Sequence, residues 1–536
     1  MKFFNTEGPV NQPDHYKLNP LYRWDYDEIM TLIKQKKYFI LHAPRQTGKT
    51  SCLLALCDEL NEKGDYFAVY ANVEAGQVPR NDIKRAMKAI VTELLGNVKS
   101  FLRDDFDFFK ALEYYEKVEA ENGLNAILTY LSELIDKPIV LFIDEIDALV
   151  GDTLISVFRQ LRAGYTKRPK SFPSAIILCG LRDIKDYRIH LSEKEIITGG
   201  SPFNIITRSL RLGNFSKEDV IELYGEHTKE TGQIFTEDCF DFVMKNTDGQ
   251  PWLVNALAYE VAFDMKANRD RSIPLTIESF EMAKETLILS KRTHLDQLIH
   301  KLKEERVRNI ILPMILGNKT EPNEDDIQYC VDLGLIKDTK EGIKISNLIY
   351  KEVIPRELTA DTQRTFLKEH IPEWVDTDSS IDVHRLLTLF KEFWNENTSI
   401  WASSIAGYQE AAPNLVLQAF LQRVLNGGGY INREYGLGNR RTDIFIRWFY
   451  QKEGKKYTQR IVMELKIIGK NQNYEAIKKD ALEQTAKYAQ TCGVKEAQIL
   501  IFDRNKSQNW TADEPNEYAE FDGISFEIWK LGTGVW

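Results

Sequence analysis

The stretch Ala43-Pro44-Arg45-Gln46-Thr47-Gly48-Lys49-Thr50 decides the fold, because it separates an apolar segment from an amphipathic one. The apolar segment, residues 38–41, is typical of a strand, and the apolar residues within 53–60 repeat on one face of a helix. The letters match the phosphate-loop pattern G-x-x-x-x-G-K-[ST], except that Ala43 replaces the first glycine. The sequence therefore predicts a loop that binds phosphate groups at the N-terminus of a helix.

The residue types of this loop have chemical reasons. Backbone N–H groups of a tight turn surround phosphate oxygens, Lys49 neutralises the outer phosphates, and the Thr50 hydroxyl binds Mg²⁺. Ala43 is compatible with such a turn only if its backbone keeps an ordinary φ angle. We expect the nucleotide to be bound by Pro44, Arg45, Gln46, Thr47, Gly48, Lys49, Thr50 and Ser51.

Composition narrows the class of protein. With 536 residues, 43% of them hydrophobic and 28% charged, the chain is expected to be soluble and to form several domains. No apolar run approaches the roughly 20 residues of a membrane helix, and residues 1–9 lack the apolar region of a signal peptide. The net charge of −10 excludes a polycationic nucleic-acid coat, and the six scattered cysteines indicate reduced thiols. We therefore expect a cytoplasmic protein that does not enter membranes.

A second motif adds carboxylates to the predicted phosphate site. Residues 138–143 form a continuous apolar run, as in buried parallel strands, and Asp144 and Glu145 follow directly. Carboxylates at the carboxyl end of such a strand face the phosphate loop in an α/β sheet. Asp144 would hold magnesium, directly or through water, and Glu145 would orient and deprotonate the attacking water. Nucleotide hydrolysis is thus expected in addition to binding.

Arg182 follows a further apolar strand, residues 175–178. In ATPases with this organisation, the strand between the phosphate loop and the acidic strand carries a residue that senses the γ-phosphate. Arg182 is placed for that role or for an inter-subunit arginine. An ion pair with Asp183 or Asp186 is an equally good structural interpretation.

The remaining pattern defines the predicted domains. Residues 216–266 are helical and begin with a capping box at Ser216 and Asp219. Residues 325–358 are typical of a winged-helix unit, which either binds DNA or packs as a regulatory module; its acidic first helix favours packing. The fold class is α/β multidomain, with these domains: a P-loop ATPase core with a parallel sheet between helices at 1–212, a helical lid at 213–310, a winged-helix-like unit at 311–360, a linker or helical segment at 361–400, and a second α/β domain at 401–536.

The C-terminal region contains a second group of candidate catalytic residues. Two strand-like segments, 441–446 and 460–466, are joined by a polar loop and form a predicted hairpin. Asp443 lies at the head of the first segment, whereas Glu464 and Lys466 share one side of the second. Two carboxylates that bind Mg²⁺ beside an ammonium group can hydrolyse a phosphodiester, because the metal activates water and the lysine stabilises charge.

The same letters also allow a structural interpretation, in which Glu464 forms an ion pair with a neighbouring lysine of an edge strand. Three neighbours favour chemistry: Gln484 and Tyr488 share one face of the next helix, and Glu410 precedes the hairpin. Residues 431–470 hold ten basic against four acidic side chains. This excess fits either a solvated hairpin or a local nucleic-acid surface.

Several of these stretches resemble known families. The N-terminal part resembles the prokaryotic AAA-like ATPases related to the STAND class, on residues 4–10, 41–50, 161–165, 180–183 and 248–252. The C-terminal part is similar to the PD-(D/E)XK nucleases fused to such ATPases, on residues 433–436, Asp443, Glu464-x-Lys466 and Gln484-x-x-x-Tyr488.

The resemblance implies ATP and Mg²⁺ at the first site, with Asp144 and Glu145 as the Walker B metal ligand and base. It implies metal-dependent cleavage of nucleic acid by a restriction-endonuclease-like domain, with Asp443, Glu464 and Lys466 as its core and Mn²⁺ as a possible substitute for Mg²⁺. A role in genome defence or mobile elements is also implied. Two departures from the family pattern are Ala43, in place of the first loop glycine, and the lack of a polar sensor near Cys179. The second departure bears on the rate of hydrolysis more than on binding.

Two hypotheses follow. The first is an ATP-regulated nuclease that forms a homo-oligomer and acts on nucleic acid, with DNA favoured over RNA. The second is a signalling or scaffold ATPase whose C-terminal domain recognises nucleic acid or a partner without catalysis. A DNA-translocating motor is weaker, because the sequence shows one phosphate loop and no second nucleotide core.

Overall fold

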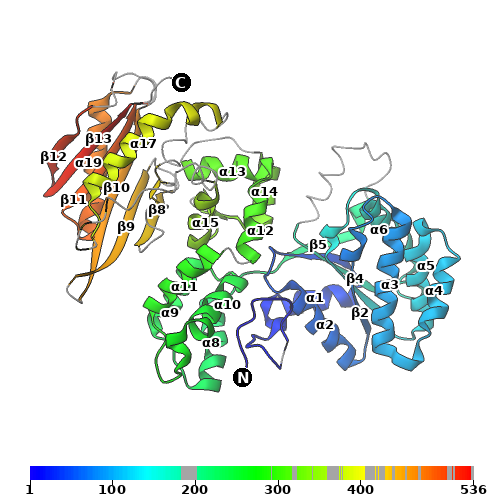
Figure 1. The fold of residues 1–536 in the computed structure, drawn as a ribbon. Helices are drawn as coiled ribbons and strands as arrows, with labels where there is room; N and C mark the ends of the chain where they lie inside the picture. The colour runs from blue at the N-terminus through cyan, green and yellow to red at the C-terminus, as the bar shows by residue number, and fades with distance from the viewer. Residues whose placement is uncertain are drawn as a thin grey trace. The chain divides into compact units, whose positions relative to one another are not determined.

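The computed structural model, shown as a ribbon in Figure 1, divides into two compact units. The first contains Met1–Asp296 and Asn323–Leu348, and the second contains Gln297–Pro322 and Ile349–Trp536. The structure describes residues 1–11, 13–182, 202–290, 293–316, 323–340, 342–358, 374, 376, 378, 380–404, 417, 420, 421, 429–436, 441–452, 455–468, 472–503, 510 and 514–532.

A five-stranded parallel sheet forms the centre of the first unit. Its strand order is β2-β3-β4-β1-β5, and every adjacent pair is parallel. The order confirms the prediction that the strand after the acidic motif, β4, lies between the phosphate-loop strand and the acidic strand. The strands are β1 (Tyr38–His42), β2 (Phe67–Asn72), β3 (Ile139–Asp144), β4 (Ala175–Gly180) and β5 (Ile206–Arg211).

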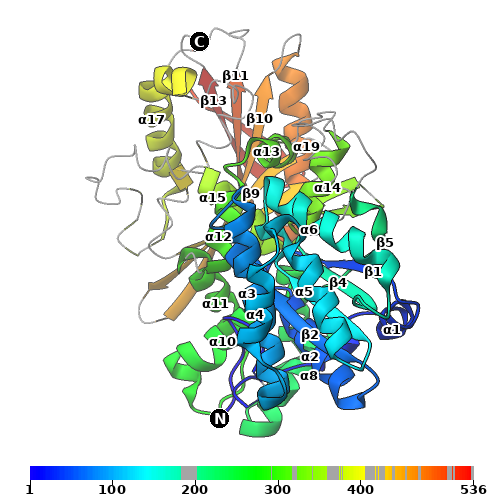
Figure 2. The ribbon, with the colours of Figure 1, turned by 90° about the vertical axis from the view of Figure 1, so that its right-hand side faces the viewer.

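Helices cover both faces of this sheet, which explains why β1, β3 and β4 are buried at every position and, apart from His42 and Asp144 at the strand ends, carry no charged or imidazole side chain. Phe39 and Leu41 pack with residues of α1 and α2, whereas Tyr38 and Ile40 pack with residues of α3 to α6. Figure 2 looks onto the layer that contains α3, α4 and α5. The helices are α1 (Tyr26–Lys34), α2 (Lys49–Lys63), α3 (Ile83–Leu102), α4 (Phe108–Glu116), α5 (Ala120–Leu134) and α6 (Gly151–Gly164).

A helical segment follows the sheet, as predicted, and begins with the expected capping box between Ser216 and Asp219. The break between its second and third helices needs a glycine. Gly249 has φ +70°, and a Cβ there would lie 2.0 Å from the carbonyl oxygen of Phe215. The helices are α8 (Lys217–Thr231), α9 (Glu237–Thr247), α10 (Pro251–Tyr259), α11 (Ile277–Ser290) and α12 (Thr293–Lys301).

The predicted winged-helix region contains helices α13 (Glu305–Leu316), α14 (Glu324–Asp332) and α15 (Leu348–Leu358), with the expected hairpin of β6 (Ile336–Thr339) and β7 (Gly342–Ile345). Residues 323–348 of this region belong to the first unit. The domain boundaries given by the sequence remain predictions.

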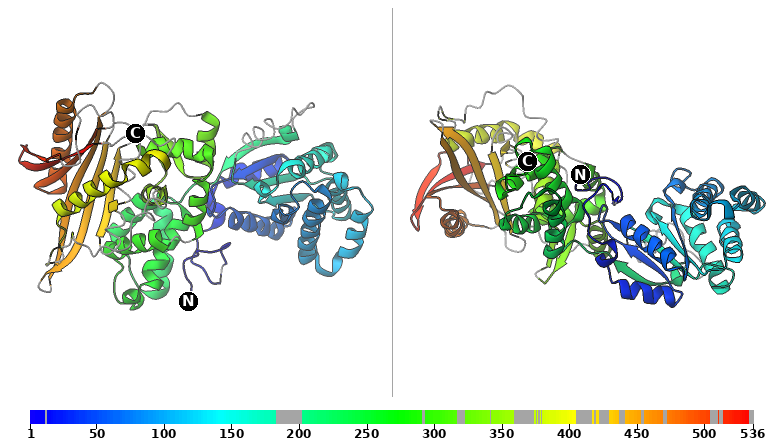
Figure 3. Two further views of the ribbon diagram at one scale, coloured as in Figure 1. Left: turned by 45° about the horizontal axis from the view of Figure 1, so that its top comes forward. Right: turned by 90° about the horizontal axis from the view of Figure 1, so that it is seen from below.

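The second unit is built on a six-stranded mixed sheet of order β12-β13-β11-β10-β9-β8. Strands β8, β9 and β10 are antiparallel, and β10, β11 and β13 are parallel. The right-hand view of Figure 3 shows α17 and α19 on opposite faces of this sheet. The elements are α17 (Val383–Ser404), β8 (Gly429–Gly436), β9 (Arg441–Lys452), β10 (Lys455–Ile468), α19 (Tyr474–Cys492), β11 (Glu496–Asp503), β12 (Glu517–Phe521) and β13 (Ile524–Gly532).

The predicted hairpin is present but longer than the sequence suggested. Residues 447–452 and 455–459, which the sequence assigned to the joining loop, continue β9 and β10. Aromatic residues such as Trp448, Tyr450 and Tyr457 have high strand propensity, and cross-strand partners stabilise them. The sequence predicted a loop here because the segment is rich in polar residues.

Short helical turns complete the first unit: η1 (Pro20–Arg23), η2 (Glu74–Gly76), η3 (Arg103–Asp105), η4 (Ile146–Ala148), η5 (Tyr165–Lys167), η6 (Pro202–Ile205), η7 (Glu260–Asp264) and η8 (Lys266–Arg269). Among the described residues, no helix has the length and apolar character needed to cross a membrane. The six cysteines are free thiols.

Candidate functional site

The phosphate loop lies where the sequence predicted, between β1 and α2. Gly48 caps α2 with φ +91°, and Gln46 also has a positive φ of 57°. Lys49 donates from Nζ to the carbonyl oxygens of Ala43 at 2.9 Å and Pro44 at 3.0 Å. Its ammonium is therefore held over the loop, among the backbone groups that would surround phosphates.

Ala43 fits the loop because its backbone is not in the left-handed region. Its Cβ is fully buried in a small cluster with Cys52 and Leu212. The side chain thus contributes packing at the position where a glycine is usual, and the loop turn is formed farther along the chain. The departure from the motif has a structural explanation.

Asp144 is the centre of the acidic motif. Only 1% of its side chain surface is exposed, and its oxygens accept three hydrogen bonds. The donors are the Thr50 hydroxyl at 2.7 Å, the Tyr70 hydroxyl at 2.9 Å and the Glu145 backbone N–H at 2.9 Å. The hydroxyl and carboxylate oxygens of Thr50 and Asp144 are the hard donors that Mg²⁺ prefers, so this pair fits the predicted ion.

Tyr70 was not identified from the sequence. It lies on β2, which pairs with β3, and its hydroxyl reaches the same oxygen of Asp144 as Thr50. The sequence offered one sign of this contact, the single hydroxyl of Tyr70 near the end of an apolar strand. Its significance depends on the strand order, which the sequence does not state.

Glu145 is held in an unusual backbone conformation, with φ 58° immediately after β3. Burial, followed by the neighbouring charge of Asp144, raises the pKa of this carboxyl above its ordinary value. A carboxylate with a raised pKa is a better general base than an exposed one. The position and the pKa direction agree with the role that the sequence predicts for Glu145.

Arg182 lies just beyond the end of β4 and forms an ion pair with Asp147 at 2.8 Å. Asp147 also accepts a hydrogen bond from the backbone N–H of Leu181. The ion-pair partners considered from the sequence, Asp183 and Asp186, lie outside the described residues. The proposed sensor role of Arg182 remains a prediction.

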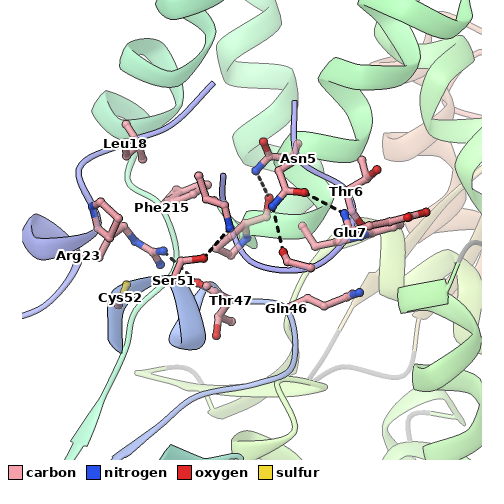
Figure 4. A pocket seen from close by; sticks show the side chains of 17 residues that line it. Asn5, Thr6, Glu7, Leu18, Arg23, Gln46, Thr47, Ser51, Cys52 and Phe215 are labelled. Carbon is pink, nitrogen blue, oxygen red and sulfur yellow. Dashed lines mark hydrogen bonds between the residues drawn. The ribbon is translucent and has the colours of Figure 1, made fainter. Parts of the chain in front are cut away.

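A pocket of about 110 Å³ adjoins the loop (Figure 4). The N-terminal segment forms one wall, and residues of the loop and of α10 form others. Val10 donates its backbone N–H to the Ser51 hydroxyl at 2.9 Å, and Arg23 donates to the Thr47 carbonyl at 2.9 Å. Its position beside the loop is where the base and sugar of a nucleotide would lie if the phosphates were bound on the loop.

The α10 wall of the pocket depends on Trp252. Its indole N–H donates to the Thr6 carbonyl at 2.8 Å, and its ring stacks on His294 with 5.0 Å between centroids. Complete burial lowers the pKa of His294 to about 3. The neutral imidazole therefore forms part of the support for the pocket.

Residues 323–348 lie against the phosphate loop within the first unit. Arg211 donates to the Val331 carbonyl at 2.9 Å, and His42 pairs with Asp332 at 3.9 Å. A Cβ at Gly334 would lie 2.7 Å from the side chain of Pro44. His42 is buried and ends β1.

The second candidate site lies on the face of the C-terminal sheet that α19 covers. Glu464 is fully buried, and its Oε1 lies 3.1 Å from the ammonium of Lys466. Lys466 also contacts Asp480 at 3.0 Å and donates to Gln484 Oε1 at 2.9 Å. The structure therefore brings together three of the sequence-predicted residues and adds Asp480.

Strand register places residue 443 directly opposite Glu464. The side chain of Asp443 and the whole of Glu410 lie outside the described residues. Tyr488 is on α19 and packs edge-to-face on Phe445, with 6.3 Å between ring centroids. Asp480 precedes Gln484 by one helical turn, and that spacing was the signal available in the sequence.

The surroundings of the Glu464 carboxylate suit a ligand of a cation. Among the described residues, neither of its carboxylate oxygens has a hydrogen-bond partner, although the carboxylate is fully buried. A buried carboxylate without hydrogen bonds is costly, and a metal ion would remove that cost. The described part of the chain contains no group of three His, Cys, Asp or Glu residues gathered for a metal, and it excludes the Asp443 side chain.

A family model described as an AAA-like domain matches residues 24–354, more than half of the chain. A Walker-type ATPase of Pyrococcus abyssi is 14% identical with a TM-score of 0.47, over 66% of this chain and 99% of that one. Cdc6p of Pyrobaculum aerophilum is 16% identical with a TM-score of 0.36, over 66% and 97%.

The RuvB Holliday junction branch migration motor of Thermotoga maritima is 13% identical with a TM-score of 0.33, over 62% of this chain and 95% of that one. No curated protein matches the sequence.

The lowered pKa of His294 gives a prediction for stability against pH. The depressed pKa means that the stabilising contribution of neutral His294 is complete above pH 6.5 and is lost as pH falls from 6.5 towards about 3. His294→Phe keeps an aromatic ring on Trp252 but does not titrate. Urea unfolding of the parent should lose about 1.4 kcal/mol per pH unit more than the variant below pH 6.5.

The matched control is His300→Phe, at an exposed position of the same helix. It should keep the parental pH dependence. Equal pH dependence in the parent and His294→Phe would contradict the assignment.

Proposed function

This chain belongs to the AAA-like domain family, and from that premise we propose that it is an ATPase whose nucleotide state controls a metal-dependent nuclease in its second unit. The observation that carries the nuclease part is the buried Glu464 carboxylate beside Lys466, without hydrogen bonds from the described residues. The chain carries two sites with different chemistry. We assign control by nucleotide to the first site and cleavage to the second.

At the first site, Lys49 would bind the outer phosphates and the helix N-terminus of α2 would bind their oxygens. Thr50 and Asp144 would hold Mg²⁺, which neutralises phosphate charge when bound. The pocket beside the loop would take the adenine and ribose. Ser51 and Thr47 connect that pocket to the loop through their contacts with Val10 and Arg23.

Glu145 would deprotonate the water that attacks the terminal phosphate. Its position next to Asp144 places a base beside the metal ligand, and its raised pKa favours proton acceptance. Hydrolysis would change the charge that the loop binds. That change is the physical signal that a controlled site could use.

At the second site, Glu464 and Asp443 would bind Mg²⁺ or Mn²⁺, which supplies Lewis-acid stabilisation of the phosphodiester when bound. Lys466 would stabilise charge on the attacked phosphate or orient water. Gln484 holds the Lys466 ammonium at 2.9 Å and would fix its direction. Glu410 and Tyr488 would complete the site as the sequence predicts.

Control of the second site by the first rests on chain continuity. Residues 323–348 contact Pro44 of the phosphate loop and His42 at the end of β1, and the second unit resumes at residue 349. A nucleotide-dependent change in the conformation of the phosphate loop would therefore act on residues 323–348. This segment continues directly into the second unit at residue 349. Assembly into a homo-oligomer and a role in genome defence or mobile elements remain part of the proposal.

A competing candidate is a scaffold ATPase with a non-catalytic second unit. The contact between Lys466 and Asp480 at 3.0 Å favours it, because an ion network of Glu464, Lys466 and Asp480 can be purely structural. The two candidates differ in what removal of Glu464 does to stability and to cleavage.

The ATPase assignment predicts a separation of binding from hydrolysis. Glu145→Gln should bind ATP as the parent does, and its hydrolysis rate should fall by at least about 100-fold, because the base is lost. Glu113→Gln, at an exposed side chain of α4, is the control and should hydrolyse normally. Phosphate release with ATP and Mg²⁺ measures the rates, and parental hydrolysis by Glu145→Gln would refute the assignment of the base.

The nuclease assignment predicts that Glu464→Gln and Lys466→Ala each reduce cleavage of duplex DNA by at least about 100-fold. Glu483→Gln, at a half-exposed side chain of α19, should cut normally. Cleavage is measured on linear, circular and single-stranded substrates with ATP and Mg²⁺ or Mn²⁺.

A catalytic role requires that Glu464→Gln lose cleavage without a lower unfolding temperature. A structural network predicts lower stability with no cleavage by the parent. Cleavage by Glu464→Gln at the parental rate would exclude the nuclease assignment.

A further inference from the structure

Two side chains of helix α19 and one of strand β10 form a closed ring of hydrogen bonds at the second candidate site. The Lys466 ammonium donates to Asp480 Oδ2 at 3.0 Å and to Gln484 Oε1 at 2.9 Å. The Gln484 amide nitrogen in turn donates to the other carboxylate oxygen of Asp480. Asp480 and Gln484 lie one helical turn apart, so both side chains reach Lys466 from the same helix face.

This ring uses most of the hydrogen-bonding capacity of the Lys466 ammonium. A lysine ammonium has three N–H donors, and Asp480 and Gln484 accept from two of them. The Glu464 carboxylate, 3.1 Å from the same nitrogen, is a third close neighbour. Any phosphate oxygen that reaches the ammonium must therefore compete with these neighbours.

The two carboxylates beside Lys466 differ in the cost of leaving it. Glu464 has no exposed side-chain surface, so it cannot exchange the ammonium for water. The side chain of Asp480 is 54% exposed, whereas that of Lys466 is 10% exposed. Water would therefore solvate the Asp480 carboxylate as it left the ammonium, and an ion pair with so exposed a partner contributes little to stability. Asp480 is the anion that an incoming anion can replace.

The Asp480 carboxylate shares with a phosphodiester the property that Lys466 recognises. Both groups are anions with oxygen acceptors, and an ammonium binds either one through charge-assisted hydrogen bonds. The carboxylate also repels a second anion that approaches the same ammonium. Asp480 thus weakens phosphate binding in two ways, because it occupies a donor and adds a like charge beside it.

The direction of this effect distinguishes a competitor from a metal ligand. Loss of a metal ligand or of a structural partner weakens a site, whereas loss of a competitor for the ammonium strengthens phosphate binding. Among the described residues, Asp480 belongs to no group of three potential metal ligands. The sign of the change on removal of the Asp480 charge therefore identifies its role.

We propose that the Asp480 carboxylate occupies the place of a substrate phosphate at the Lys466 ammonium, and that duplex DNA displaces it on binding. The inference rests on the proposed nuclease function, which makes a phosphodiester the substrate. Gln484 keeps its hydrogen bond to Lys466 in both states and holds the ammonium in place, while Asp480 turns to solvent. Asp480 is then an inhibitory residue of the second site.

The test is binding of a short labelled duplex DNA to the full chain in EDTA, where no metal-dependent cleavage occurs, followed by fluorescence anisotropy. Asp480→Asn keeps the size of the side chain and an acceptor for Gln484 but removes the charge. It should bind DNA about two- to fivefold more tightly than the parent, the range expected for loss of a partly exposed ion pair. Asp480→Ala removes the whole carboxylate and should also bind more tightly.

Glu483→Gln is the matched control, because it removes the same charge from a side chain of α19 that is 50% exposed. It should bind DNA as the parent does. In a Lys466→Gln background, Asp480→Asn should have no effect, because the ammonium for which Asp480 competes is absent.

Weaker or parental binding by Asp480→Asn would overturn the proposal. An equal gain with Glu483→Gln, or an undiminished gain in the Lys466→Gln background, would also overturn it, since the effect would then be one of general charge. Absence of DNA binding by both the parent and Asp480→Asn would overturn it as well.

The outcome is independent of cleavage. If Asp480→Asn gains affinity only when Lys466 is present, but no variant cuts DNA, the nuclease assignment fails and the role of Asp480 stands. If the parent cuts DNA but Asp480→Asn binds no more tightly, the role of Asp480 fails and the nuclease assignment stands.

Discussion

The hydrogen bond from Thr50 to Asp144 is the contact on which the first site depends. It joins the start of α2 to the end of β3 and so spans the strand between them. Because Asp144 is buried, its ionised form requires strong donors, and Thr50, Tyr70 and the backbone of Glu145 provide them. The parallel sheet, the loop turn and the acidic strand must all be in place before this contact can form.

The second unit also contains a buried carboxylate, but its charge is compensated in a different way. Glu464 is as deeply buried as Asp144, yet among the described residues only the ammonium of Lys466 compensates its charge. Asp144 accepts three hydrogen bonds, whereas the charge of Glu464 is balanced by one ammonium, so a second cation would lower the cost of burying Glu464. This contrast separates the two sites more clearly than their sequence motifs do.

Patterns confined to one strand or loop were predictable from the sequence. The phosphate loop, the Asp144-Glu145 end of β3 and the side-by-side Glu464 and Lys466 all depend on local spacing. Tyr70, Asp480 and the pocket beside Val10 were not found, because each depends on which elements become neighbours. Residues 447–452 and 455–459 were missed for another reason: their polar side chains are typical of a loop, and only cross-strand pairing makes them strands.

We propose that bound nucleotide controls the second unit, and this proposal rests on residues 323–348, which lie against Pro44 of the phosphate loop and are followed along the chain by the second unit. The most direct measurement is the ratio of DNA cleavage rates with and without ATP, in the parent and in Lys49→Ala. The account predicts a ratio that differs from one by at least about tenfold in the parent, because bound phosphate reorganises the loop, and a ratio of one in Lys49→Ala. Equal cleavage by the parent with and without ATP, or an unchanged response in Lys49→Ala, would contradict it.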